Sequence, residues 1–98
     1  MGSRQLYSCD FEIYGKVQRV FFRKYTEKKA KELGLHGWVM NTSHGSVKGI
    51  IEGTQDELGK MKTWLSTKGS PKSVIDNAIF TDLKPITTYT YRGFEIRK

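Results

Sequence analysis

The sequence has little cysteine, no long apolar run and no block of like charges, and each absence excludes a class of protein. The single cysteine, Cys9, cannot form a disulfide within the chain, which excludes a disulfide-stapled scaffold. No apolar run is long enough to span a membrane and no secretory signal pattern is present, so we expect no membrane association and a cytoplasmic location. The charges are dispersed, which argues against a nucleic-acid-binding tail.

What the sequence does contain is material for one core and an excess of positive charge. Its 98 residues, of which 37% are hydrophobic, suffice for one domain and are too few for two, so we expect a single domain over residues 1–98. A domain this small has no need to assemble, and we expect a monomer. Lys and Arg number 17 against 10 Asp and Glu, a formal charge of +7. That balance suits anionic partners, although a basic soluble protein without such a partner would show it too.

The first third of the chain changes from a strand pattern to a helix pattern. Residues 7–13 alternate apolar and polar side chains and predict a strand with one buried face, on which Cys9 is a core thiol. We expect Gly15 to end this strand. Residues 22–33 carry apolar side chains at helical spacing, and Gly34 follows them as a stop signal.

The rest of the chain predicts a hairpin, a second helix and two more strands. Thr54 and Glu57 form a T-x-x-E capping box, which is typical of a helix start. These elements are expected over residues 36–42, 47–52, 55–66, 74–83 and 91–97. The order predicts an α+β fold, a ferredoxin-like β-α-β-β-α-β sandwich in which two helices cover one face of an antiparallel sheet, with a short extra C-terminal strand. This fold hosts many functions, so function must be argued from a site.

Positive charge gathers where the first helix should begin. Residues 15–24 read GKVQRVFFRK and contain no acid. A helix N-terminus already exposes unpaired N–H groups and about half a positive charge, so Arg23 and Lys24 in the first turn are unfavourable unless an anion binds there. A phosphate would be bound by the loop N–H groups, the helix dipole and the planar fork of Arg23. The alternative is a solvated Arg23 on a helix that begins later.

Other kinds of catalytic site are not visible in the sequence. His36 and His44 have no cysteine or carboxylate partners at metal-ligand spacing, so we expect no metal site and no cofactor. No Ser-His-Asp or Cys-His arrangement can be argued, and there is no Walker loop. The acids are scattered, and no general acid–base pair stands out.

Two segments resemble the signatures of the acylphosphatase family. Residues 15–23, which contain G-x-V-Q-x-V-x-F-R, are similar to the first signature, and residues 37–47, GWVMNTSHGSV, are similar to the second. The likeness continues through residues 61–65 and 69–71 and covers nearly the whole chain. Two signatures in this order and at this spacing are far more specific than the fold.

The resemblance implies an enzyme that hydrolyses the carboxyl–phosphate bond of small acyl phosphates to a carboxylate and inorganic phosphate, without a metal. It implies that Arg23 binds the phosphoryl oxygens and that Asn41 holds the attacking water. Backbone N–H groups would complete a phosphate cradle, formed by Gly15, Lys16, Val17, Gln18, Arg19 and Val20. Inorganic phosphate would also bind as an inhibitor.

This chemistry is compatible with a sequence that shows no general acid and no metal site. The leaving group is a carboxylate whose acid has a pKa of about 4, so it departs without being protonated. Phosphoryl transfer depends mainly on positioning and on charge stabilisation. An amide is a poor base, so we expect Asn41 to orient the water, while an oxygen of the substrate's own phosphate takes the proton.

The chain departs from the family pattern at Arg19, where the family loop usually has glycine. Glycine would permit a positive φ and a close approach of the backbone to phosphate. We therefore expect Arg19 to strain the loop, to shift its N–H groups or to screen the entrance. These effects bear on rate and affinity more than on the fold.

Two alternatives to this enzyme stay open at the level of sequence. A catalytically weak relative would bind small anions or a protein partner only. An RNA-binding ferredoxin-like module has the same element order, and Arg92-Gly93-Phe94 opens like the RNP1 motif. Glu95, however, stands where Gly or Ala belongs, and the match lies on the last strand rather than the third. We therefore expect core packing for Phe94 and Ile96, and no nucleic-acid partner.

Overall fold

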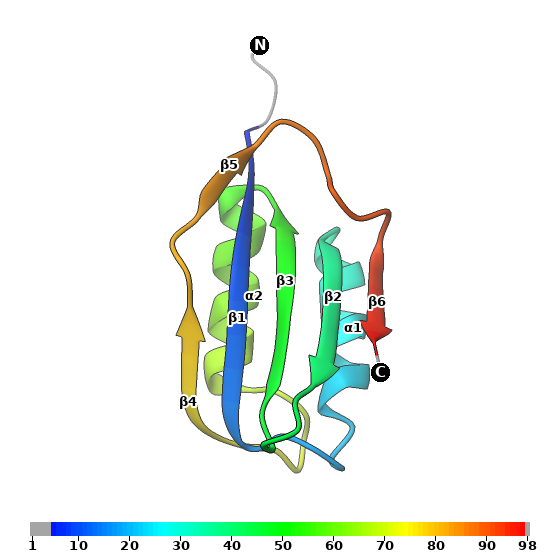
Figure 1. Ribbon diagram of the computed structural model, residues 1–98, viewed down its shortest axis with the longest axis vertical. Coiled ribbons are helices and arrows are strands. Elements are labelled where there is room, and N and C mark those ends of the chain that lie inside the picture. Colours follow the sequence, from blue (N-terminus) through cyan, green and yellow to red (C-terminus); the bar gives the residue numbers. More distant parts are fainter. Residues whose placement is uncertain (1–4, 98) are drawn as a thin grey trace.

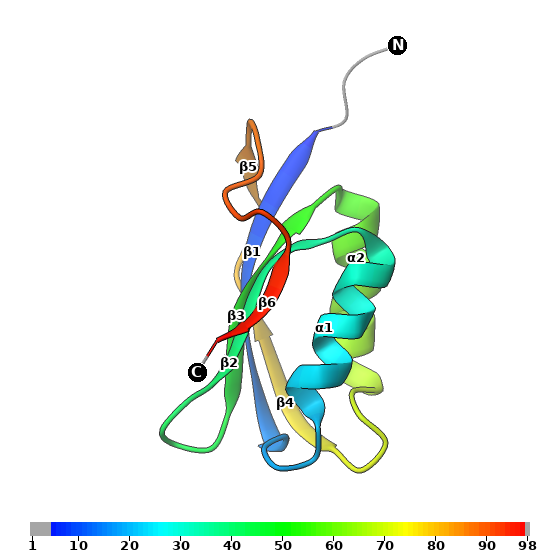
Figure 2. The ribbon, with the colours of Figure 1, turned by 90° about the vertical axis from the view of Figure 1, so that its right-hand side faces the viewer.

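The computed structural model describes residues 5–97, which form two layers: a β-sheet and a pair of helices on one of its faces (Figure 1, Figure 2). The helices are α1 (Phe22–Leu33) and α2 (Gln55–Thr67). The strands are β1 (Leu6–Lys16), β2 (His36–Asn41), β3 (Val47–Gly53), β4 (Val74–Phe80), β5 (Lys84–Ile86) and β6 (Phe94–Arg97).

The sheet has the strand order β4-β1-β3-β2-β6, and β5 pairs with the start of β1. Neighbouring strands from β4 to β2 are antiparallel, whereas β6 joins β2 in parallel. The predicted ferredoxin-like sandwich is confirmed, and the last strand makes its sheet mixed. Because β5 pairs with β1 and β6 lies beside β2 at the opposite edge of the sheet, a long connection carries the chain from β5 across the end of the sheet to β6 (Figure 1).

That β5–β6 connection is fastened by a buried carboxylate. The side chain of Glu52 is 1% exposed and accepts hydrogen bonds from the N–H groups of Thr90 at 2.9 Å and Tyr91 at 3.2 Å. Beside it, His36 donates from Nδ1 to the Tyr91 carbonyl oxygen at 2.7 Å and stacks on Tyr89 with ring centroids 3.6 Å apart. Hydrogen bonds to a charged group are stronger than neutral ones, so these contacts hold the connection against the sheet.

Both helices follow their predicted bounds closely. α1 spans residues 22–33 as predicted, and Gly34 ends it with a left-handed φ of 76°. At α2 the Glu57 N–H donates to Thr54 Oγ1 and the Glu57 carboxylate accepts from the Thr54 N–H, which confirms the capping box. α2 ends one residue later than predicted. Within residues 5–97, no helix has the length and hydropathy needed to cross a membrane.

The strand predicted over residues 74–83 is wrong in its last three residues. β4 ends at Phe80, and the chain resumes pairing with β1 only at β5. At the break, Thr81 Oγ1 accepts the Asp10 N–H at 2.9 Å, so a side chain takes the place of the carbonyl that would continue the ladder. The last strand begins at Phe94, three residues later than predicted.

The core lies between the sheet and the helices. Its buried apolar residues are Cys9, Phe11, Ile13, Val17, Val20, Phe22, Ala30, Leu35, Val39, Val47, Ile51, Leu58, Met61, Leu65 and Phe94. Cys9 is 1% exposed, as predicted, and burial raises the pKa of its thiol.

Phe94 is 5% exposed and Ile96 packs against the core, so neither is free to stack on a base. The core packing expected for Phe94 and Ile96 is therefore confirmed.

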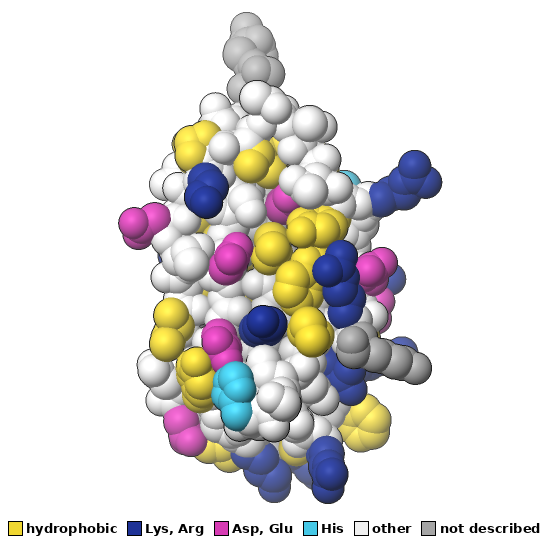
Figure 3. All heavy atoms as spheres, in the orientation of Figure 1, with side chains coloured by type: hydrophobic (Ala, Val, Ile, Leu, Met, Phe, Trp, Pro, Cys, Tyr) yellow, Lys and Arg dark blue, Asp and Glu magenta, His cyan; other side chains and the backbone are white. Residues whose placement is uncertain are grey.

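The helix-free face of the sheet carries apolar, acidic and basic side chains side by side (Figure 3). Part of its apolar surface is covered by an arginine from β6. The Arg97 guanidinium lies 4.6 Å from the ring centroid of Trp38 and 5.5 Å from that of Tyr91. These cation–π contacts hold β6 against β2 from outside the core.

Candidate active site

Three connections meet at one end of the sheet, where the predicted site residues lie (Figure 1, Figure 2). They are the β1–α1 loop (17–21), the β2–β3 turn (42–46) and the α2–β4 connection (68–73). Gly15 and Lys16, the first two residues of the predicted cradle, belong to the end of β1 rather than to the loop, so Gly15 does not end that strand. The fold thus brings both signature segments to the N-terminus of α1.

A bulge and two left-handed residues shape the β1–α1 loop. The β1–β4 register shifts between Tyr14 and Gly15, where φ is 128° and a Cβ would lie 2.1 Å from the Val74 carbonyl oxygen. No residue other than glycine fits there. Further along, Arg19 and Phe21 have φ values of 63° and 59°. The positive φ that the family glycine would accommodate is therefore present at Arg19, whose side chain is exposed.

The backbone N–H groups of this loop are not all free to bind a ligand. The Val17 N–H donates to the Gly15 carbonyl oxygen at 3.1 Å, which tightens the turn. The side chains of Val17 and Val20 are buried and anchor the loop to the core. Among the described residues, the N–H groups of Gln18, Arg19 and Val20 have no hydrogen-bond partner. Unpaired donors therefore cluster over residues 18–20.

The N-terminus of α1 is neither capped nor neutralised. Its N-cap residue is Phe21, whose side chain accepts no hydrogen bond, and its first turn contains no acid. The helix begins at Phe22, so Arg23 and Lys24 lie in the first turn as predicted, and the alternative of a later start is wrong. Arg23 is half-buried and pairs with no carboxylate of residues 5–97. Positive charge is therefore left uncompensated at the positive end of the helix dipole.

A hollow of about 410 Å³ opens beside this helix start. It is lined by Val17, Arg19, Phe21, Phe22, Arg23, Lys24 and Ile96. The charged lining residues are all cations, and the other walls are apolar. Such a pocket attracts an anion and shields it partly from water, which strengthens charge-assisted hydrogen bonds.

Asn41, the last residue of β2, supplies a buried acceptor. Its Oδ1 is inaccessible to solvent and has no hydrogen-bond partner within the described part of the chain. Buried amide oxygens normally have partners, so this unpaired acceptor is an exception at the end of the sheet where the site lies. Asn41 does not line the 410 Å³ hollow itself, and it is linked to the loop through its neighbour Thr42.

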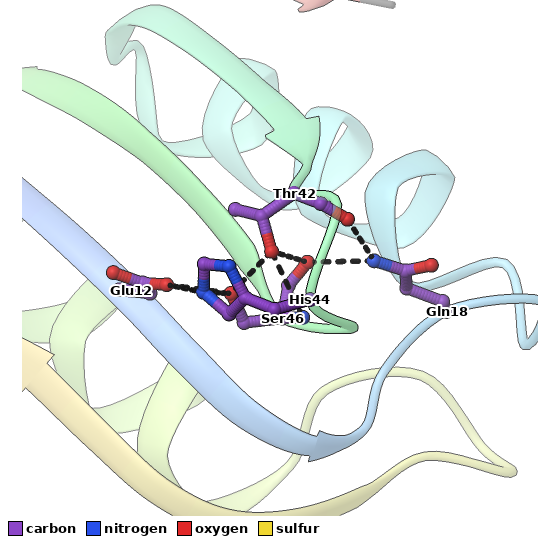
Figure 4. A network of polar contacts seen from close by, with 5 residues as sticks. All are labelled: Glu12, Gln18, Thr42, His44 and Ser46. Atoms are coloured by element: carbon purple, nitrogen blue, oxygen red, sulfur yellow. Dashed lines mark hydrogen bonds and ion pairs between the residues drawn. The ribbon is translucent and has the colours of Figure 1, made fainter.

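The side chain of Gln18 ties the β1–α1 loop to the β2–β3 turn (Figure 4). Its Nε2 donates to the carbonyl oxygens of Thr42 at 3.0 Å and Ser46 at 2.9 Å. The sequence predicted a backbone role for Gln18 and missed this side-chain role. Through these two bonds the segment that carries Asn41 is held against the loop that carries the unpaired N–H groups.

The carboxylate of Glu12, on β1, also holds the β2–β3 turn (Figure 4). Ser46 Oγ donates to Glu12 Oε2 at 2.6 Å, and His44 Nε2 lies 3.0 Å from the same oxygen. The hydroxyl oxygens of Thr42 and Ser46 are 2.7 Å apart. The hydrogen bond from Ser46, and after it the one from His44, lowers the pKa of Glu12. This network was not predicted, because its only signal in the sequence was the place of Glu12 on the polar face of its strand.

The two histidines lie in separate networks. His44 contacts Glu12 at the β2–β3 turn, whereas His36 contacts the β5–β6 connection. Among residues 5–97, no three side chains of His, Cys, Asp or Glu come close enough together to hold a metal ion.

Fold and pocket together define a small α+β protein with a basic anion pocket at the start of its first helix. The acylphosphatase family model matches residues 9–96. Acylphosphatase-1 of Mus musculus is 52% identical over 93 residues, which cover 95% of this chain and 94% of that protein. Acylphosphatase-1 of Gallus gallus is 50% identical over 97 residues, which cover 99% and 98%. The structure of an acylphosphatase from Coxiella burnetii matches with a TM-score of 0.85 at 34% identity, over 99% of this chain and 100% of that one.

This chain therefore belongs to the acylphosphatase family, and it is an enzyme that hydrolyses acyl phosphates. The two alternatives, a relative that only binds and an RNA-binding module, are not favoured.

The Glu12 network makes a prediction about acid stability. Because the pKa of Glu12 in the folded protein lies below its ordinary value of 4.5, its stabilising effect is present above that value and is lost as the pH falls through the folded-state pKa. Glu12→Gln should lower the free energy of unfolding by about 1 kcal/mol at pH 7 and by much less near pH 3. Urea unfolding at both pH values measures this. Glu32→Gln, on the exposed side of α1, is the matched control, and an equal loss at both pH values would refute the charged role of Glu12.

The positive φ at Arg19 makes a second prediction. Arg19→Gly should raise kcat/KM by up to about tenfold, because glycine adopts the left-handed turn without strain and the N–H groups of the loop can settle around the phosphate. The variant should also depend less on salt, because an exposed guanidinium attracts anions through a screened interaction. Hydrolysis of benzoyl phosphate across an ionic-strength series tests both points, with Arg92→Gly as a control for the lost charge. If Arg19→Gly is slower at every salt concentration, Arg19 is a phosphate ligand.

Proposed function

We propose that hydrolysis takes place at the start of α1, with the phosphoryl group held by Arg23 and the 15–20 segment and with the attacking water oriented by Asn41. The observation that best supports this proposal is the uncapped start of α1, where Arg23 has no carboxylate partner among the described residues. A bound phosphoryl group would compensate the helix dipole and the guanidinium at once.

Three kinds of donor would converge on the phosphoryl oxygens. Arg23 offers two parallel N–H bonds, which a lysine cannot reproduce. The unpaired backbone N–H groups of residues 18–20 supply neutral donors of fixed direction, and the N-terminus of α1 adds its dipole. The Val17 N–H is already bonded to the Gly15 carbonyl oxygen and is not free for phosphate. The role of residues 15–17 is then to shape the turn that presents the donors.

The water would be oriented by the side-chain amide of Asn41, whose Oδ1 has no other hydrogen-bond partner among the described residues. The water oxygen attacks phosphorus as the bond to the carboxylate oxygen breaks. Because an amide does not take up a proton near neutral pH, the proton passes to a phosphoryl oxygen of the substrate. The carboxylate leaves unprotonated, since its acid has a pKa of about 4. The products are a carboxylate and inorganic phosphate.

The setting of the reaction is also part of the proposal. The 98-residue chain acts as one domain and as a monomer, in the cytoplasm. The single core of the described residues supports the first point, and a buried free cysteine is compatible with a reducing compartment. Inorganic phosphate, which fits the same donors as the substrate, is a competitive inhibitor as well as a product.

Arg23 provides the direct test of the site. Arg23→Ala should reduce kcat/KM for benzoyl phosphate by at least about a hundredfold, because it removes the charge-assisted bonds to the phosphoryl group. Arg23→Lys should recover only part of the loss, since it restores charge without the fork. Arg92→Ala, which removes an exposed arginine outside the proposed site, should behave like the wild type. Near-normal hydrolysis by Arg23→Ala in the presence of EDTA would place the phosphate site elsewhere.

Asn41 should respond differently, because it is assigned to the water and not to the phosphate. Asn41→Ala should lower kcat by about a hundredfold while the inhibition constant of inorganic phosphate stays within a factor of about two. Asn41→Asp should also be slow, since it brings a negative charge close to the anion. Asn77→Ala on the exposed part of β4 is the control. Weaker phosphate inhibition with an unchanged kcat would make Asn41 a binding residue.

A further inference from the structure

Phe21 combines three unfavourable features that the fold does not explain. Its side chain is 76% exposed, its backbone is left-handed with φ 59° and ψ 23°, and it occupies the N-cap of α1 without capping it. Positive φ is a genuine outlier for a bulky residue. Glycine would relax the backbone, and serine or aspartate would cap the helix. Strained residues of this kind gather at functional sites, so the question is what the ring does.

The ring of Phe21 takes no part in aromatic packing. Among the described residues, the ring–ring contacts join Tyr14 to His44, Phe22 to Trp64 and His36 to Tyr89. The very next residue, Phe22, is 1% exposed and fills the core. Two consecutive phenylalanines therefore lie in opposite environments, and only the second is buried in the core.

Phe21 stands between two neighbouring hollows. The first is the 410 Å³ hollow that contains Arg19 and Arg23. The second, of about 530 Å³, runs along the outer face of α1 and is lined by Phe21, Lys24, Tyr25, Glu27, Lys28 and Lys31. Phe21 and Lys24 line both hollows, and Tyr25 is 41% exposed in the second. The 410 Å³ hollow therefore adjoins, at Phe21, a surface formed by the ring of Tyr25 and the aliphatic parts of lysine side chains.

The shape of the substrate gives this arrangement a use. An acyl phosphate joins its phosphoryl group to its acyl group through one oxygen, so a phosphoryl group held by Arg23 leaves the acyl group beside the rim of the pocket. A large apolar or aromatic acyl group that covers the exposed ring buries apolar surface and so stabilises the bound substrate. A methyl group covers little of the ring and stabilises it less.

We propose that Phe21 binds the acyl group of the substrate, and that the enzyme prefers acyl phosphates with an aromatic or bulky apolar acyl group to those with a small one. The inference rests on the site proposed at the start of α1. It adds to that site a residue that recognises the leaving group and not the phosphate.

The test compares benzoyl phosphate with acetyl phosphate in the wild type, Phe21→Ala and Phe21→Leu. The wild type should show the higher kcat/KM with benzoyl phosphate. In Phe21→Ala the ratio of the two kcat/KM values should fall about tenfold, equivalent to about 1.4 kcal/mol, mainly through KM for benzoyl phosphate. Phe21→Leu should recover part of the preference. Ile79→Ala removes an apolar side chain that is 50% exposed on β4, and it should leave the ratio unchanged.

The inhibition constant of inorganic phosphate separates acyl recognition from damage to the loop. An unchanged ratio in Phe21→Ala, or an equal loss with both substrates together with weaker phosphate inhibition, would overturn the proposal and make Phe21 a structural residue. A wild-type preference for succinyl phosphate over benzoyl phosphate would also overturn it, in favour of Lys24 and Lys28 as binders of an acidic acyl group. Failure of the underlying site is recognised separately, because Arg23→Ala would then still hydrolyse both substrates.

Discussion

The two hydrogen bonds of the Gln18 amide are the contacts on which the geometry of the site depends. The β1–α1 loop carries the donors for an anion, and the β2–β3 turn follows Asn41; Gln18 joins the two through one side chain. A single hydrogen bond contributes only about 1 kcal/mol, so neither bond would hold the loop alone. The bonds from Ser46 to Glu12 and between Ser46 and Thr42 continue the network into β1, and together they leave the turn few alternative positions.

The two helices differ in how far they obey the local rules of stability. The capping box of α2 and the glycine after α1 are what a stable helix requires. The start of α1 has the opposite character, with left-handed Arg19 and Phe21, no cap and two cations in the first turn. Each of these features raises the free energy of the protein without ligand. Such conflicts are expected where the chain serves a ligand, and the well-packed core offsets them.

Sequence reasoning was most successful where structure follows from near neighbours. The bounds of α1, the capping box at Thr54 and the buried face of β1 depend on contacts within a few residues, and all three are confirmed. The break after Phe80 was missed because it depends on Thr81 meeting Asp10 across the sheet. Gln18 was placed in the cradle through the family resemblance, but its side-chain partners lie 24 and 28 residues away and carry no local signal. Predicting such contacts requires the fold first.

The position of β6 has a consequence for the order in which the protein assembles. Ile96 forms part of the wall of the 410 Å³ hollow, although the donors of that hollow come from residues near position 20. During synthesis, a chain that has emerged only through α2 holds both signature segments yet lacks this wall. The pocket closes only when the β5–β6 connection has crossed the sheet and settled on Glu52. A ribosome-bound fragment that stops before β6 would therefore carry every proposed catalytic residue and still present an open, more hydrated site.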